Sequence, residues 1–397
     1  MRRRVLLIGM GRVGRPYAKA ARELGVDLAV LDHPASLKFA RARGFLDDDQ
    51  AGRPVLGTST AAWYSALPEV LAAGEVHGVV AFGEPHVTAA ALIADELGLP
   101  GPGLRAAAVS QDKALQRSLF ARHGIAQPAA LAPSDLDTAA MWAASRYPVI
   151  AKPADGTGSR GVRLVADETG LRDWHAANAG APFLVEQYLE GPEYSLECVV
   201  QGGRLVWAEP TRKTTTEPPF YVELGHTVPA GLPDPGPARA LAAAVAGAMG
   251  MRDGLMHLEF RLEDSGPHLM EVAVRTPGDR IFELHALAHG TDLFAAAIKV
   301  ALGEDPGIRR TRSGAAAIRF PAAEPGVVTR IEGVPATRRL PEVADLEIDV
   351  APGDRVHPTR SSRDRVAAVL LTAPDTDALE RAVKTAADLL HIRTAPE

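Results

Sequence analysis

Cysteine is nearly absent from this chain, which contains a single one, Cys198. One thiol cannot form a disulfide within the chain, and such scarcity indicates a reducing compartment. Long apolar runs are also missing, since none approaches the ~18 residues of a membrane-spanning helix. The basic start leads into an apolar patch that is too short for a signal peptide and reads as a first buried strand. We therefore expect a soluble, cytoplasmic protein without a membrane partner, in which Cys198 is an apolar strand residue.

A net positive charge is lacking as well, because the 397 residues carry a formal net charge of −6. A chain without a basic field does not attract nucleic acid, so no nucleic-acid partner is expected. Lysine is sparse beside the abundant arginine and alanine, which makes each lysine worth examining. At 46% hydrophobic residues the chain can bury a large core, and its length allows two or three domains.

The first part of the chain, to about residue 108, alternates apolar strands with helices. Predicted strands are 5–9, 27–32 and 78–84, and predicted helices are 15–24 and 87–98. Continuous apolar runs are typical of buried parallel strands, and strand–helix alternation is typical of a doubly wound α/β sheet.

A second part begins near Ser110, a candidate N-cap for a helix that Gly124 ends. Further predicted elements are strands 147–155, 161–167 and 183–191, a hairpin at Gly202-Gly203, and helices 237–250 and 291–302. Short strands and a helix at 376–390 form a small α+β tail. The predicted domains are 1–108, 109–315 with a lid at about 140–190, and 316–397.

A predicted hairpin at 256–279 brings two carboxylates together. Alternation places Leu258, Phe260 and Leu262 on one face of the first strand and Met270, Val272 and Val274 on the same face of the second. If Ser265 is the pivot of the turn, Glu259 faces Glu271. Opposed like charges destabilise a strand pair, unless a cation binds there or a proton is shared. Mg²⁺ suits two carboxylates beside a phosphate. The alternative is a solvated hairpin whose acids splay apart.

A glycine fingerprint, Gly9-x-Gly11-x-x-Gly14, follows the first strand, and Asp32 ends the next. This pattern resembles a dinucleotide-binding turn, with Asp32 on a ribose. Any tight strand-to-helix turn selects the same glycines, however, and nothing downstream suggests hydride transfer. The turn could instead bind a substrate carboxylate at the helix N-terminus.

Phosphate-handling residues surround a second glycine-rich loop. Lys152 ends an apolar strand and precedes residues 155–161, which include Gly156, Ser159 and Gly161. Backbone N–H groups of such a loop can cover phosphates, and its flexibility suits a lid. The alternative is an ordinary hairpin turn. Lys113, on a helix, is a further candidate cation, with a solvated surface position as its alternative.

A nucleotide could be read by the strand end 186–193. Glu193 could accept hydrogen bonds from ribose hydroxyls, while the backbone from Glu186 through Gln187 to Leu189 could read an adenine edge. Taken together, these segments resemble the ATP-grasp superfamily in order and spacing over about residues 105–300. The resemblance implies ATP and Mg²⁺, or Mn²⁺ in its place, with a Rossmann-like pre-ATP-grasp domain before the ATP-grasp fold and a small α+β domain after it.

Residues 218–230 and 271–279 resemble the L-amino acid ligases within that superfamily. The resemblance implies that His226 lies near an acyl phosphate or substrate carboxylate. Arg275 would stabilise the transferring phosphoryl group, and Lys152 would neutralise phosphate oxygens. The superfamily usually has an asparagine two residues after the second metal carboxylate. Ala273 stands there and cannot be a ligand, which leaves the number of metal ions open.

The implied reaction joins a small-molecule carboxylate to an amine through an acyl phosphate, releasing ADP and phosphate. Candidate substrate-binding residues are Glu84 and His86, at a strand end, and Asp279 and Arg280, beyond the metal strand; ordinary loop charges are the alternative. A homodimer is one expected arrangement. Other readings are amino-acid loading onto a carrier protein, bicarbonate activation by a carboxylase, and an NAD(P)-binding oxidoreductase.

Overall fold

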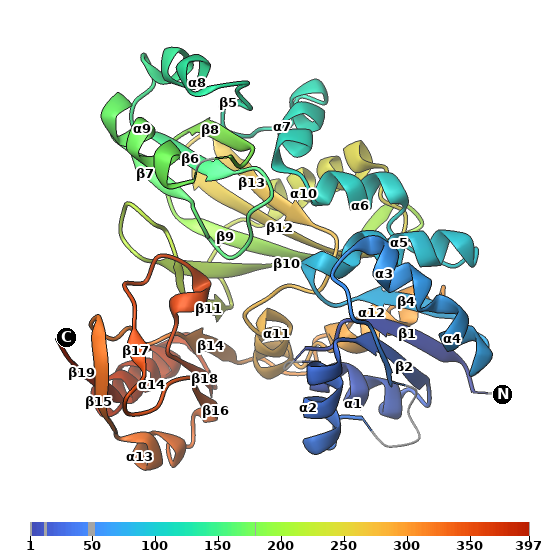
Figure 1. The fold of residues 1–397 in the computed structure, drawn as a ribbon. Coiled ribbons are helices and arrows are strands. Elements are labelled where there is room, and N and C mark those ends of the chain that lie inside the picture. Colours follow the sequence, from blue (N-terminus) through green and yellow to red (C-terminus); the bar gives the residue numbers. More distant parts are fainter. Residues whose placement is uncertain (1, 12–13, 47–51, 179, 397) are drawn as a thin grey trace.

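The computed structural model describes residues 2–11, 14–46, 52–178 and 180–396. In this part of the chain, no helix is both long and apolar enough to cross a bilayer. Figure 1 shows the long central strands with the N-terminal elements, the small sheet at the top and the C-terminal part arranged around them.

The N-terminal region forms a four-stranded sheet of order β3-β2-β1-β4, and all its pairings are parallel. Its strands are β1 Arg4–Ile8, β2 Asp27–Asp32, β3 Gly52–Pro54 and β4 Gly78–Ala81. Its helices are α1 Arg15–Glu23, α2 Pro34–Ala42, α3 Thr60–Ser65, α4 Leu67–Ala72 and α5 Val87–Glu96, with a 3₁₀ turn η1 Glu84–His86. Apolar clusters cover both faces of the sheet, which confirms the predicted α/β alternation.

Helices α6 Leu104–Ser110 and α7 Lys113–Arg122 lead out of this region. The N-cap of α7 is Asp112, whose carboxylate accepts hydrogen bonds from the backbone of the first turn. The prediction of Ser110 as the N-cap of α7 is wrong. Ser110 is the last residue of α6, and its hydroxyl donates to Ala107 O within that helix.

An eight-stranded sheet of order β13-β12-β9-β10-β11-β14-β18-β16 forms the centre, with antiparallel pairing throughout. Its strands are β9 Glu193–Gln201, β10 Arg204–Thr215, β11 Glu223–Val228, β12 Gly254–Glu263, β13 Gly266–Ala273, β14 Ala315–Arg319, β16 Val343–Ile348 and β18 Ala367–Ala373. Helices α10 Gly236–Met249, α11 Ile281–His289 and α12 Leu293–Ala301 lie between these strands in the chain. Three strands of the tail thus continue the central sheet, since the edge of β11 would otherwise be unpaired.

Two smaller sheets complete the fold. The lid sheet has the order β5-β8-β6-β7, and the second has the order β17-β15-β19. The lid elements are β5 Ala130–Leu131, α8 Leu136–Ala143, β6 Val149–Pro153, β7 Arg163–Val165, α9 Glu168–Ala177 and β8 Phe183–Gln187. The other elements are β15 Gly326–Glu332, α13 Val334–Arg338, β17 Arg355–Val356, η2 Ser362–Asp364, α14 Thr376–Leu389 and β19 His391–Ala395. The exact domain boundaries stay a prediction.

Candidate active site

The two hairpin carboxylates lie opposite each other, because Glu259 on β12 pairs with Glu271 on β13. The predicted pairing is confirmed, although a bulge follows Glu259 and shifts the register toward the turn. The bulge places Leu269 in the core, while Met270 lines a cavity beside the two acids. The prediction that Met270 packs on the apolar face is therefore wrong.

Lysines neutralise both carboxylates. Lys113 Nζ lies 3.0 Å from Glu271 Oε1 and also donates to Gly156 O. Lys213 Nζ lies 3.1 Å from Glu259 Oε2 and 2.5 Å from Glu193 Oε1. Burial alone would lower the pKa of Lys213, but Glu193, Glu259 and a third neighbouring acid hold it well above its usual range.

Lys213 was missed by sequence reasoning. Its side chain is 1% exposed, and the third acid is Glu223, at 3.5 Å. The only signal in the sequence was that Lys213 is one of few lysines and lies in a strand rich in threonine. The acidic partners of Lys213 come from three different strands, so their proximity could not be predicted.

His257 contacts Glu259 from the neighbouring position on the same sheet face. Its Nδ1 lies 2.8 Å from Glu197, and its Nε2 lies 3.2 Å from Glu259. Burial would lower the pKa of His257, but the two carboxylates raise it to about 9. A protonated His257 therefore orients Glu259 while adding positive charge behind it.

A buried ionic triad joins strands β6 and β8 of the lid sheet to helix α7. The carboxylate of Glu186 is 2.7 Å from Lys152 Nζ and accepts from Arg117 on α7. Burial alone would raise the pKa of Glu186, but the two cations hold it at about 2. Lys152 lines the cavity, so the Glu186 side chain positions this lysine rather than facing the cavity itself.

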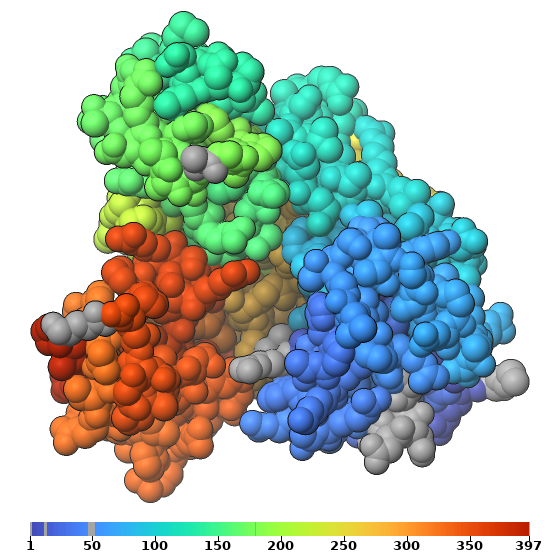
Figure 2. Space-filling view, in the orientation of Figure 1, coloured from blue at the N-terminus to red at the C-terminus, as the bar shows by residue number. Residues whose placement is uncertain are grey.

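The space around these groups, the hairpin cavity, opens between the lid sheet and the hairpin. Its lining includes the following predicted residues: Lys113, Lys152, Gly156, Ser159, Leu189, Glu193, Glu259, Glu271 and Arg275. Gly161, Glu186 and Gln187 do not line it. Figure 2 shows the surface hollowed where the lid, the N-terminal region and the C-terminal part meet.

The glycine loop at 155–161 reaches across to the C-terminal part. Gly158 O accepts a hydrogen bond from Ser362 N at 3.1 Å, and Ser159 Oγ lies 3.3 Å from Glu223 Oε1. Ser159 has a positive φ of 57°, a conformation that a non-glycine residue rarely adopts. The loop is thus held over the hairpin cavity by contacts with two distant segments.

A second space of about 480 Å³, the tail cavity, adjoins the first. It is lined by aromatic and charged side chains: Phe82, Phe282, Phe294, Phe320, Asp279, Arg280, Glu283, Glu347, Asp349, Arg363 and Arg365. Arg275 also lines it, so this guanidinium lies at the junction of the two cavities.

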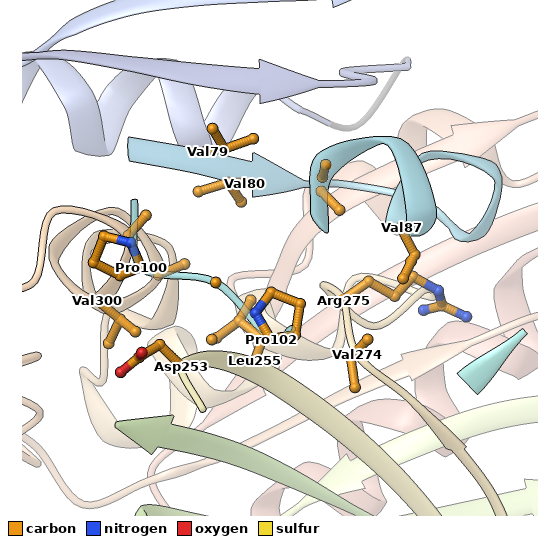
Figure 3. Close-up of a pocket in the computed structure, with 16 residues that line it drawn as sticks. Val79, Val80, Val87, Pro100, Pro102, Asp253, Leu255, Val274, Arg275 and Val300 are labelled. Atoms are coloured by element: carbon orange, nitrogen blue, oxygen red, sulfur yellow. The ribbon is translucent and has the colours of Figure 1, made fainter. Parts of the chain in front are cut away.

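Arg275 is held by Glu84, whose carboxylate lies 2.5 Å from its Nε and also accepts from Gln111. Burial would lower the pKa of Arg275, but Glu84 raises it. Figure 3 shows the Arg275 side chain at one end of a further, largely apolar pocket, near Val87 and Val274. That pocket measures only about 40 Å³, which is too small for an amino acid.

Asp279 is bound by two partners at the edge of the tail cavity. It accepts from Arg365 and lies 2.9 Å from His226 Nε2, while the buried His226 Nδ1 has no hydrogen-bond partner in the described part of the chain. Burial would raise the pKa of Asp279, but His226 and Arg365 hold it far below its usual range. Arg280 contacts Glu283 and also acids of β16.

The glycine turn after β1 is occupied by side chains of the protein itself. Asp32 accepts hydrogen bonds from Met10 N and Gly11 N, and a Cβ on Gly9 would lie 2.0 Å from the His86 ring. These contacts explain the fingerprint without a dinucleotide. They also place His86 against the turn rather than on the tail cavity; Arg12 and Val13 lie outside the described residues.

The arrangement fits a divalent cation, because Glu259 and Glu271 converge beside two lysines that neutralise them when no ion is bound. Ala273 follows on β13 and offers no ligand atom. Two carboxylates are therefore the protein ligands that the hairpin can supply.

Sequence models of two families match the chain. An ATP-grasp domain matches residues 145–282, and the L-amino acid ligase C-terminal domain 2 matches residues 319–395. Residues 145–282 thus match an ATP-grasp domain, the domain that the sequence predicted. The chain also resembles the L-amino acid ligases, through its C-terminal match and through relatives that include carnosine synthases.

Individual relatives agree with this placement. An uncharacterized protein, y4rH, of Sinorhizobium fredii is 28% identical, over 100% of this chain and 84% of that protein. Carnosine synthase 1 of Gallus gallus is 27% identical over 76% of this chain, which spans only 35% of that protein. The crystal structure of an L-amino acid ligase from Bacillus licheniformis superposes with a TM-score of 0.81 at 19% identity, over 99% of both chains. This last similarity shows the fold.

Proposed function

We propose that the chain binds ATP in the hairpin cavity, activates an amino-acid carboxylate in the tail cavity as an acyl phosphate, and joins it to an amine. The single observation that carries this proposal is the position of Arg275 at the junction of the two cavities. A phosphoryl group passing from a nucleotide in one cavity to a carboxylate in the other would pass this guanidinium.

The proposed nucleotide-binding roles follow from charge and position. Lys113 and Lys152 would neutralise phosphate oxygens as point charges, and Glu193 would accept from the ribose. Glu259 and Glu271 would hold Mg²⁺ or Mn²⁺, which would neutralise phosphate charge when bound. The glycine loop would exclude water from the acyl phosphate.

The tail cavity supports an amino acid as the carboxylate substrate. Guanidinium groups of Arg275 and Arg363 offer planar donors for a carboxylate, and acids such as Glu347 can pair with an ammonium group. Phenylalanine rings, including Phe282 and Phe294, form an apolar wall that suits a hydrophobic side chain. The remaining assignments of Glu84, Asp279, Arg280 and His226 to substrate binding or orientation stay predictions, as do the homodimer and the cytoplasmic location.

We predict that ADP release will require both an amino acid and a second compound with a free amine. The measurement is a coupled ADP assay across pairs of amino acids, with the amide product identified by mass spectrometry. Blocking the amine of one partner by acetylation provides the matched control, because the acetylated compound can still donate its carboxylate but cannot accept an acyl group.

The same assay separates the other readings. ADP release with bicarbonate alone would support a carboxylase, and acylation of a carrier protein without a free product would support carrier loading. Nicotinamide binding without ATP turnover would contradict the ligase proposal altogether.

A further inference from the structure

A buried cluster on the central sheet lies outside both cavities. It consists of Glu209 on β10 and of His285 and His289 on α11, whose candidate ligand atoms all lie within 4.8 Å of one another. The residues are 4%, 0% and 4% exposed, respectively. Nothing in the proposed ligase chemistry uses them. A buried acid and two buried imidazoles in one place therefore need another explanation.

Helix geometry brings the two histidines together. His285 and His289 are four residues apart on α11, so both side chains project from the same face. The carboxylate of Glu209 meets them from β10: its Oε2 lies 3.9 Å from His285 Nδ1, and its Oε1 lies 3.0 Å from His289 Nδ1. Three ligand atoms from two rigid elements therefore converge on one point.

Among the described residues, neither buried Nδ1 atom has a hydrogen-bond partner, because even the 3.0 Å contact of His289 with Glu209 lacks the alignment of a hydrogen bond. Leaving such buried atoms unsatisfied destabilises the folded chain. The other nitrogen of His285, Nε2, lies 3.0 Å from Thr211 Oγ1. If Nε2–H donates to that hydroxyl, the lone pair of Nδ1 points at the cluster, which is how outer-sphere partners orient metal-binding histidines.

Protonation favours the same role. Burial lowers the pKa of His285 to about 4 and lowers the pKa of His289 as well. Burial thus favours the neutral imidazole, the form that binds metal ions.

Arg310 is the cation that contacts Glu209 in this structure. Its side chain is 57% exposed and belongs to a segment that docks on the end of α11, where Thr311 N donates to His289 O. The exposed guanidinium of Arg310 can move into solvent once a bound cation replaces it as the partner of the buried Glu209 carboxylate. Its departure would open a path to the cluster.

We propose that Glu209, His285 and His289 form a binding site for a transition-metal ion, with Zn²⁺ as the preferred occupant. Two imidazole nitrogens and one carboxylate suit Zn²⁺, with water in the fourth position. Mg²⁺ is disfavoured, because it prefers oxygen ligands in octahedral geometry.

The site would fasten α11 to the central sheet. Helix α11 begins directly after Asp279 and Arg280, and β10 continues from Glu209 to Lys213. A metal clamp at this place would therefore fix elements that carry residues of both cavities, while touching neither cavity itself.

The test is Zn²⁺ titration of the EDTA-stripped full-length chain against a chromophoric chelator, without nucleotide or Mg²⁺. We expect one Zn²⁺ per chain at submicromolar affinity, and unchanged binding in Glu271→Gln, which alters only the hairpin. His289→Gln should weaken binding more than about a hundredfold, because even outer-sphere changes cost 10–100-fold. His123→Gln, at an exposed position, is the matched control.

A second variant keeps the test decisive if His289→Gln fails to fold. Arg310→Ala removes the competing cation from an exposed position, so Zn²⁺ affinity should increase and the d–d bands of bound Co²⁺ should appear at lower metal concentration. Equal Zn²⁺ affinity in wild type and His289→Gln, or no increase in Arg310→Ala, would mean that the Glu209–Arg310 ion pair alone explains the cluster and would overturn the proposal.

Discussion

Glu271→Gln is expected to lower ATP-dependent turnover by roughly 10²–10³, the scale observed when one charge-stabilising contact is removed from an active site. The amide keeps the shape of the side chain but removes the negative charge that would hold a divalent cation beside Glu259. The fold should survive, because Lys113 keeps its hydrogen bond to Gly156 O. The measurement is steady-state ADP release at saturating substrates, together with a thermal unfolding curve.

The matched control is Glu263→Gln on the same hairpin. Glu263 ends β12, accepts from Glu190 N, and does not line the hairpin cavity. Its turnover should stay at the wild-type level. Full activity in Glu271→Gln would remove the metal assignment of the hairpin.

Glu186→Gln is expected to destabilise the protein by about 3–5 kcal/mol, the usual cost of leaving a buried charge without its partner. Lys152 and Arg117 would both lose their carboxylate in a place where the Glu186 side chain is fully buried. The denaturation midpoint in urea, followed by tryptophan fluorescence, measures the loss. Glu168→Gln is the control, because Glu168 and Arg172 form an exposed ion pair on the same lid.

The Glu186 carboxylate should also make the stability of the protein depend on pH in acid. Its pKa is depressed from 4.5 to about 2 in the folded protein, so its stabilisation is complete above pH ~4.5 and is lost as the pH falls toward 2. The depression corresponds to roughly 3 kcal/mol. Wild-type and Glu186→Gln stabilities should therefore converge across this window. Parallel curves down to pH 2 would contradict the assignment.

Alternation and turn chemistry were sufficient to predict the pairing of Glu259 with Glu271, because a short turn allows few registers. They did not predict the bulge after Glu259, which moves Met270 out of the core and into the cavity. A bulge inserts one residue without changing the composition of the strand, so periodicity alone does not reveal it.

Contacts between residues that are far apart in the sequence could not be predicted either. Lys213 meets acids from β9, β11 and β12, which become neighbours only through the order of strands in the sheet. Asp279 meets Arg365 across 86 residues of chain. The local segments that carry Lys113, Lys152 and Glu193 were predictable, since each has its own glycine, cap or strand signal, whereas the ionic contacts between segments depend on tertiary structure.

The contact between the glycine loop and Ser362 makes the lid accessible to chemical control. A Cβ on Gly158 would lie 3.6 Å from Ser362 Cβ, within the span of roughly 3.5–4.5 Å that a disulfide bridges, although a cysteine there would have a strained backbone because Gly158 has a φ of 65°. The native thiol of Cys198 is buried, and burial raises its pKa, so it would not compete for oxidation. In a chain with Gly158→Cys and Ser362→Cys, oxidation could thus link the glycine loop to the C-terminal part, and a reductant could release it. Bound nucleotide should then stay with the oxidised chain on gel filtration and separate from the reduced chain.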